Sequence, residues 1–111
     1  MKLSEIVSAL ELRVAAGVSR LDTEVTGGYT SDLLSCAMAG AGKGNLWVTL
    51  QGHLNVVAVA SLNELAAVIV TEGKPVSADT ASKAEEEGVV LLQSALSSYQ
   101  VVGRLWDLGV K

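Results

Sequence analysis

The chain has 111 residues and a formal net charge of −4, and 50% of its residues are hydrophobic while 18% are charged. This length suits one compact domain, and the apolar content is sufficient for a buried core, which excludes wholesale disorder. An acidic balance without a Lys/Arg cluster argues against nucleic acid or an anionic membrane surface as the main partner.

The amino-terminal part of the chain predicts short elements separated by glycines. Ser4 precedes apolar residues at helical spacing, which predicts a helix over residues 4–10. Residues 12–15 resemble a short strand that ends at Gly17. The weak alternation over residues 19–29 is typical of irregular strand and turn.

A second helix is predicted after a run of hydroxyl and carboxylate side chains. Its three candidate N-caps are Thr30, Ser31 and Asp32. Its apolar face consists of Leu33, Leu34, Ala37 and Met38. The helix is expected to end in the glycine-rich segment 40–44. We interpret this segment as a flexible connection rather than a phosphate loop, because Gly44 follows Lys43 where a magnesium-binding Ser or Thr is required.

The second half of the chain is more regular. Apolar runs at residues 46–50, 65–70 and 89–92 have the composition of strands buried on both faces. The segments between them predict two helices, over residues 55–64 and from a cap at Ser77 to Gly88. A last helix is capped by Ser97 or Ser98 and ends at Gly109. The alternation of strand and helix favours parallel pairing with right-handed crossovers.

These elements predict one α/β domain over residues 1–111, a three-layer fold whose mainly parallel β-sheet is flanked by helices. Cys36 and His53 are the only cysteine and histidine, so we expect no disulfide, no metal site and no cofactor. Glu5 and Glu11 interrupt any signal-peptide core, and the apolar runs are too short for a membrane span. We therefore expect a cytoplasmic protein.

Polar residues follow the predicted parallel strands at the edge where ligands bind in open sheets of this kind. They offer hydroxyl, amide and backbone groups rather than a matched acid and base, which favours binding a small molecule over transforming it. The candidate ligand-binding residues are Gln51, Gly52, His53, Asn55, Thr71, Glu72, Gly73, Ser94 and Ser98.

A second candidate region precedes the predicted helix at Leu33. Its residues are Thr26, Gly27, Gly28, Ser31 and Asp32. Amides at a helix N-terminus attract anions, but a carboxylate at Asp32 satisfies those amides and repels phosphate, so capping is favoured over ligand binding here.

Three other features of the sequence are candidates for chemistry. His53 stands at the end of a strand, where capping or ligand binding is favoured over general-base catalysis. Cys36 lies between Leu34 and Ala37 and is interpreted as a small buried hydrophobic residue. The glutamates at 85–87 are unfavourable at a helix C-terminus and are interpreted as a solvated helix end.

The chain from about Leu12 to Leu108 resembles a stand-alone DRTGG domain. The matching segments are residues 25–35, 46–55 with 58–60, and 67–73. Such domains accompany CBS domains in regulated pyrophosphatases and also occur in phosphotransacetylases. The resemblance implies a regulatory or dimerising module. The chain departs from the motif that names the family: His53-Leu54 occupies the position of its Asp-Arg, and Thr71-Glu72-Gly73 occupies that of its Thr-Gly-Gly, with an acid in place of one glycine.

The leading hypothesis is a non-enzymatic regulatory module that forms a homodimer and binds a small polar ligand, such as a nucleotide. One alternative is a pure interaction subunit that joins copies or a partner protein without a ligand. Another is a small transferase or hydrolase that uses His53. The candidate dimer surfaces are the face formed by Leu33, Leu34, Ala37 and Met38, and the run from Val56 to Ala60.

Overall fold

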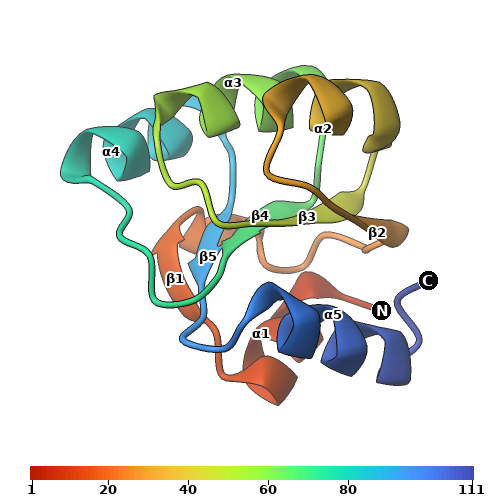
Figure 1. The fold of residues 1–111 in the computed structure, drawn as a ribbon. Coiled ribbons are helices and arrows are strands. Elements are labelled where there is room, and N and C mark those ends of the chain that lie inside the picture. The colour runs from red at the N-terminus through yellow and green to blue at the C-terminus, as the bar shows by residue number, and fades with distance from the viewer.

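A five-stranded sheet forms the middle of three layers in the computed structural model, which describes residues 1–111 (Figure 1). The strand order is β1-β5-β4-β3-β2. The strands are β1 (Arg13–Ala16), β2 (Gly27–Thr30), β3 (Asn45–Thr49), β4 (Ala67–Val70) and β5 (Leu91–Gln93). Strands β2 to β5 pair in parallel and β1 pairs with β5 antiparallel, which confirms the mainly parallel sheet.

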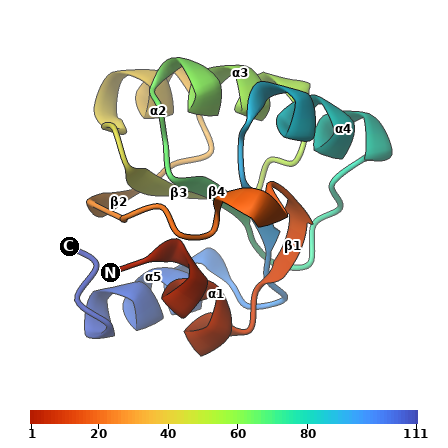
Figure 2. The ribbon, with the colours of Figure 1, turned by 180° about the vertical axis from the view of Figure 1, so that it is seen from behind.

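Helices cover both faces of this sheet. They are α1 (Leu3–Leu10), α2 (Leu34–Gly40), α3 (Leu54–Leu62), α4 (Ala78–Glu87) and α5 (Ser98–Asp107), with a 3₁₀ turn η1 at Val18–Arg20. Figures 1 and 2 show α2, α3 and α4 on one face and α1 with α5 on the other. None of these helices has the length and apolar character needed to cross a membrane.

The core is divided by the sheet because successive side chains of a strand point to opposite faces. Leu46 and Val48 of β3 pack with Ile6 and Val101 on the side of α1 and α5. Trp47, between them, packs on the other side with the helical layer of α2, α3 and α4. All of these residues are buried, so the apolar strand runs predicted from the sequence form both halves of the core.

Two of the helix caps predicted from the sequence are confirmed. The Ser77 hydroxyl accepts a hydrogen bond from the Thr80 amide, and the Ser97 hydroxyl accepts one from the Gln100 amide, both at 3.2 Å. Gly88 ends α4 with a φ of 72°, a conformation that glycine adopts at little cost. The helix predicted over residues 4–10 begins one residue earlier, at Leu3.

Three interpretations of α2 and α3 are wrong. No side chain caps α2, because Asp32 is bonded to the next strand instead. Cys36 is only half-buried, because α2 lies at the surface and turns Ala37 rather than Cys36 into the core. The run from Val56 to Ala60 offers no interface, because all of it except Ala58 is buried in the core.

Candidate functional site

The ends of β2, β3, β4 and β5 lie at one edge of the sheet, which we name the carboxyl edge and define by the loops 31–33, 50–53, 71–77 and 94–97. Hydrogen bonds join the first two loops. Asp32 Oδ1 accepts from Thr49 Oγ1 at 3.0 Å and from the Leu50 amide at 2.8 Å. The side-chain amide of Gln51 donates to the Asp32 carbonyl in a short bond. Asp32 therefore fixes the start of the loop after β3.

Replacing Asp32 by alanine is expected to lower the free energy of unfolding by about 1–3 kcal/mol, because both donors lose a charged acceptor. Asp32→Asn keeps one oxygen in the same place and is expected to lose less. Urea denaturation followed by circular dichroism measures both. Equal losses for the two variants would contradict a role based on this acceptor.

His53 caps α3 rather than standing free. Its Nδ1 accepts from the Asn55 amide at 3.2 Å, while the rest of the imidazole is exposed to solvent. An accepting Nδ1 places the proton of the neutral ring on Nε2, which faces outward. No carboxylate is hydrogen-bonded to the ring in this structure, so the orienting acid of a catalytic triad is not present beside it.

Thr71 connects the end of β4 to two neighbouring elements. Its hydroxyl lies 2.7 Å from that of Ser98 in α5 and 3.3 Å from the Thr49 carbonyl. Its amide also donates to that carbonyl, at 3.0 Å. The side chain is fully buried, so this part of the predicted site holds the edge together and is not open to a ligand.

The turn after β4 uses an unusual backbone. Glu72 and Gly73 have φ values of 58° and 64°, and the Lys74 amide closes the turn on the Thr71 carbonyl at 3.1 Å. The left-handed conformation costs a residue such as Glu72 about 1 kcal/mol or more. The amide of Gly73 donates to the Ser94 carbonyl at 3.0 Å, and that of Glu72 donates to Leu96. These amides are thus bonded within the protein rather than free for an anion.

Close packing joins the loops after β3 and β4. A side chain at Gly52 would collide with the carbonyl oxygen of Pro75. Beside this contact, the side-chain oxygen Oε1 of Gln51 is buried without a hydrogen-bond partner. An unpaired buried acceptor costs roughly 1–3 kcal/mol, so a donor from outside the chain would be favoured there.

The second candidate region is divided by β2. Thr26 lies at the other end of β2, where the strand begins, and its hydroxyl donates to the Lys43 carbonyl at 2.7 Å. Ser31 and Asp32 lie at the carboxyl edge, and the Ser31 carbonyl accepts from the Trp47 indole at 2.9 Å. Four strand residues separate the two groups by roughly 13 Å. A single small ligand therefore does not contact both.

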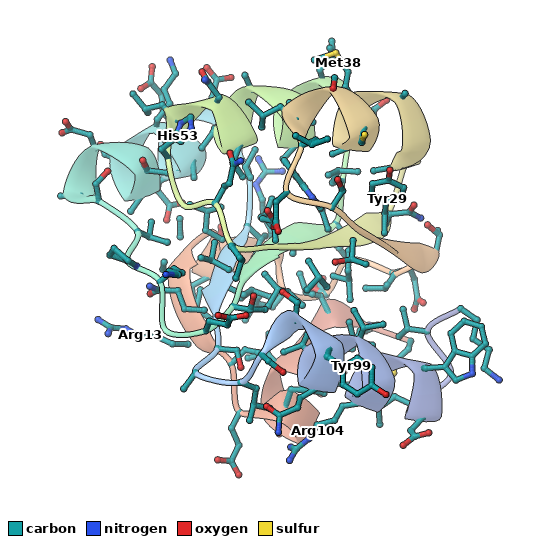
Figure 3. All side chains as sticks on the ribbon, viewed as in Figure 1. Arg13, Tyr29, Met38, His53, Tyr99 and Arg104 are labelled. Atoms are coloured by element: carbon teal, nitrogen blue, oxygen red, sulfur yellow. The ribbon has the colours of Figure 1, made fainter.

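Sequence reasoning missed Arg13 as a member of this edge. A groove of 280 Å³ is lined by Glu11, Arg13, Gly73, Gln93, Ser94 and Ala95. Arg13 reaches it because β1 runs antiparallel to β5 and pairs Arg13 with Gln93. Figure 3 shows Arg13 well apart from His53, which lies on the side of α3 and α4. Only the partner and direction of β1 could have revealed this placement.

The glutamates that end α4 each have a partner. Lys83 Nζ lies 3.2 Å from Glu87 and 3.9 Å from Glu86, and Glu85 accepts from the Gly17 amide at 3.0 Å. The hydrogen bond to Glu87, together with the charge of Glu86, raises the pKa of the Lys83 ammonium. No group of three or more His, Cys, Asp or Glu side chains could hold a metal ion.

Comparison with known proteins supports the fold. No family model and no curated protein sequence matches the chain. Among solved structures, it is similar to the crystal structure of the CBS and DRTGG domains of the regulatory region of Clostridium perfringens pyrophosphatase, complexed with the activator diadenosine tetraphosphate. The TM-score is 0.76 at 12% sequence identity, and the match covers 92% of this chain and 44% of the other. The chain thus shares its fold with part of that protein chain and spans less than half of its length.

Proposed function

We propose that the chain is a regulatory module that binds a small polar ligand, such as a nucleotide, at the carboxyl edge. The observation that carries this proposal is the unpaired side-chain oxygen of Gln51, because a small rotation of this half-buried side chain would expose the oxygen to a ligand N–H or O–H. The exposed side chains of His53 and Asn55 follow it two and four residues along the chain. The proposed ligand-binding residues are Gln51, Gly52, His53, Asn55, Glu72, Gly73, Ser94 and Ser98, while the buried Thr71 holds this edge together.

The structural neighbour supports the same class of function. Its structure contains a regulatory region with a nucleotide activator, and its fold matches nearly all of this chain. The transferase or hydrolase alternative gains no support, because His53 uses its Nδ1 as a helix cap. The proposed site therefore binds its ligand without transforming it.

The first experiment is a thermal-shift screen with ATP, AMP, diadenosine tetraphosphate and acetyl phosphate. A ligand at 100 times its dissociation constant adds roughly 2.7 kcal/mol of stability, which raises the melting temperature of a domain of this size by roughly 10 °C. The absence of a shift with every compound would contradict the proposal for these ligand classes.

A double variant tests the site itself. His53→Ser keeps a good helix cap while removing the imidazole, and Asn55→Ala removes an exposed amide. We expect the apo melting temperature to stay within a few degrees and the ligand-induced shift to disappear. A full shift in this variant would locate the ligand elsewhere.

We further propose that the module forms a twofold homodimer through the outward faces of α2 and α3. Helix α3 contains no charged residue, although a helix that is apolar all round is normally buried. Its outward Leu54 and Leu62 are 48% and 69% exposed. On the neighbouring α2, Met38 is 48% exposed, and Leu33, directly before this helix, is 64% exposed. This surface equally favours the alternative of an interaction subunit without a ligand.

Sedimentation equilibrium at micromolar concentration tests the dimer. We expect a mass of twice 11.5 kDa for the native chain and a monomer for Leu62→Asp, because a carboxylate in a desolvated interface is costly. A monomeric native chain, or a dimer unchanged by Leu62→Asp, would exclude this interface. A dimer without any thermal shift would favour the interaction subunit.

A further inference from the structure

Strand β2 has a free edge. It is the outermost strand of the sheet, with β3 on one side and no strand on the other (Figure 1). Half of its backbone N–H and C=O groups therefore point away from the sheet. Native proteins usually protect such an edge with a charge, a proline or a bulge. The four residues Gly27–Thr30 form a short strand without a charge, a proline or a bulge, and its pairing with β3 is regular over all four residues.

A hollow of 130 Å³ lies beneath this edge, on the face covered by α5. We name it the β2 hollow. Its walls are the backbone of β2, the side chain of Val48 from β3, and the side chains of Val102, Leu105 and Trp106 from α5. A cavity of about 150 Å³ accommodates one benzene molecule. The β2 hollow is thus large enough for one apolar side chain of medium size.

Gly28 leaves this space open. A side-chain carbon at Gly28 would meet only ordinary contacts, at 3.8 Å from the Leu46 carbonyl and 3.9 Å from Val110. Packing within the chain therefore does not require a glycine, and glycine weakens a strand. Tyr29, the next residue, packs instead against Gly40, and Figure 3 shows Tyr29 on the side of the sheet that α2 covers. The β2 hollow consequently has no side chain of β2 large enough to fill it.

From this geometry we propose that β2 is a docking site for an extended peptide segment of a partner protein. The segment adds a sixth strand to the sheet through backbone hydrogen bonds to the free edge, and it places one aliphatic side chain in the β2 hollow. Recognition of this kind combines main-chain bonds, which give affinity, with a pocket for alternate side chains, which gives specificity.

A positive charge beside the β2 hollow indicates which charge the partner segment carries. Lys111 Nζ lies 5.1 Å from the centre of the Trp106 ring, and both residues line the hollow. No ion pair or hydrogen bond engages this ammonium within the chain. An acidic residue next to the aliphatic one would therefore be favoured in the partner segment. A second copy of β2 does not fit, because its residues on this face are Gly28 and Thr30 and neither supplies an apolar side chain.

The proposal is tested with four capped hexapeptides of threonine and glutamate, which carry alanine, valine, leucine or phenylalanine at one central position. Trp106 is 57% exposed and Trp47 is fully buried, so acrylamide quenching of fluorescence reports on Trp106. We expect saturable protection from quenching, strongest with valine or leucine. Absence of protection with all four peptides would overturn the proposal.

One protein variant and one modified peptide test the β2 hollow and the backbone hydrogen bonds separately. Gly28→Val fills the β2 hollow while suiting a strand, and we expect it to weaken binding at least tenfold in a folded protein. An N-methylated copy of the best peptide keeps the side chains but lacks backbone donors, and it should not bind. Gly103→Ala, on α5 outside the hollow, serves as the control and should bind normally.

Unchanged binding by Gly28→Val or by the N-methylated peptide would overturn the proposal. Protection that appears without peptide as the protein concentration rises would also overturn it, because a second copy would then cover the hollow. These outcomes are independent of the ligand screen at the carboxyl edge, since no residue of the β2 hollow belongs to the loops that define it.

Discussion

Replacing Trp47 by alanine is expected to lower the free energy of unfolding by about 3–5 kcal/mol, a large part of the roughly 5–15 kcal/mol available to a domain. The indole is fully buried between the sheet and the helical layer of α2, α3 and α4. Its N–H also holds the Ser31 carbonyl at 2.9 Å. The variant thus loses core packing and one anchor of the loop after β2. Urea denaturation followed by circular dichroism measures the loss.

Two variants separate these contributions. Trp47→Phe keeps an aromatic ring but leaves the Ser31 carbonyl unpaired, and its expected loss is about 1–3 kcal/mol. Trp106→Ala changes the same residue type at a position that is 57% exposed, and its loss should be much smaller. If Trp106→Ala destabilised the protein as much as Trp47→Ala, the assignment of Trp47 to the centre of the core would be wrong.

Gly52→Ala is expected to destabilise the protein by about 1–3 kcal/mol, the usual range for overpacking. The added carbon would collide with the Pro75 carbonyl oxygen, a backbone atom that cannot rotate away. Either the loop after β3 or the loop after β4 must therefore move, and a movement of the loop after β3 also displaces Gln51. Thermal unfolding by calorimetry gives the stability, and the ligand screen gives the effect on the site.

Gly103→Ala is the matched control for this prediction. Its added carbon meets nothing within 4 Å, and the position is helical. Alanine is favoured over glycine in a helix by roughly 1 kcal/mol, so this variant should be slightly more stable than the native chain. Equal melting temperatures for Gly52→Ala and the native chain would show that the two loops are not in firm contact.

Much of the fold could be predicted because its signals are local. Apolar runs such as residues 46–50 mark strands covered on both faces, and Ser77 and Ser97 mark helix starts with a single side chain each. The limit of this reasoning is visible in α3. A helix with apolar residues on every side does not indicate which side faces the sheet. For this reason the sequence alone wrongly favours an interface for the run from Val56 to Ala60, most of which lies in the core.

The candidate site was harder to predict because its connections cross between loops. Asp32 directly precedes the region of a helix start, and this position favours a helix cap. Its hydrogen-bond partners Thr49 and Leu50 instead lie at the end of β3. Thr26 and Asp32 are close in sequence and lie at opposite ends of β2, because the strand extends between them. Neither fact could be found without the parallel register of β2 with β3.

The antiparallel first strand has a consequence for the order in which the protein can fold. β1 pairs only with β5, and Arg13 meets Gln93 across nearly the whole chain. Contacts of such sequence separation form late, because a long loop must close before they add stability. During synthesis, residues 13–16 have no strand partner until residue 93 has left the ribosome. The parallel strands β2, β3 and β4 can assemble earlier, so β1 is synthesised before the other four strands and joins the sheet last.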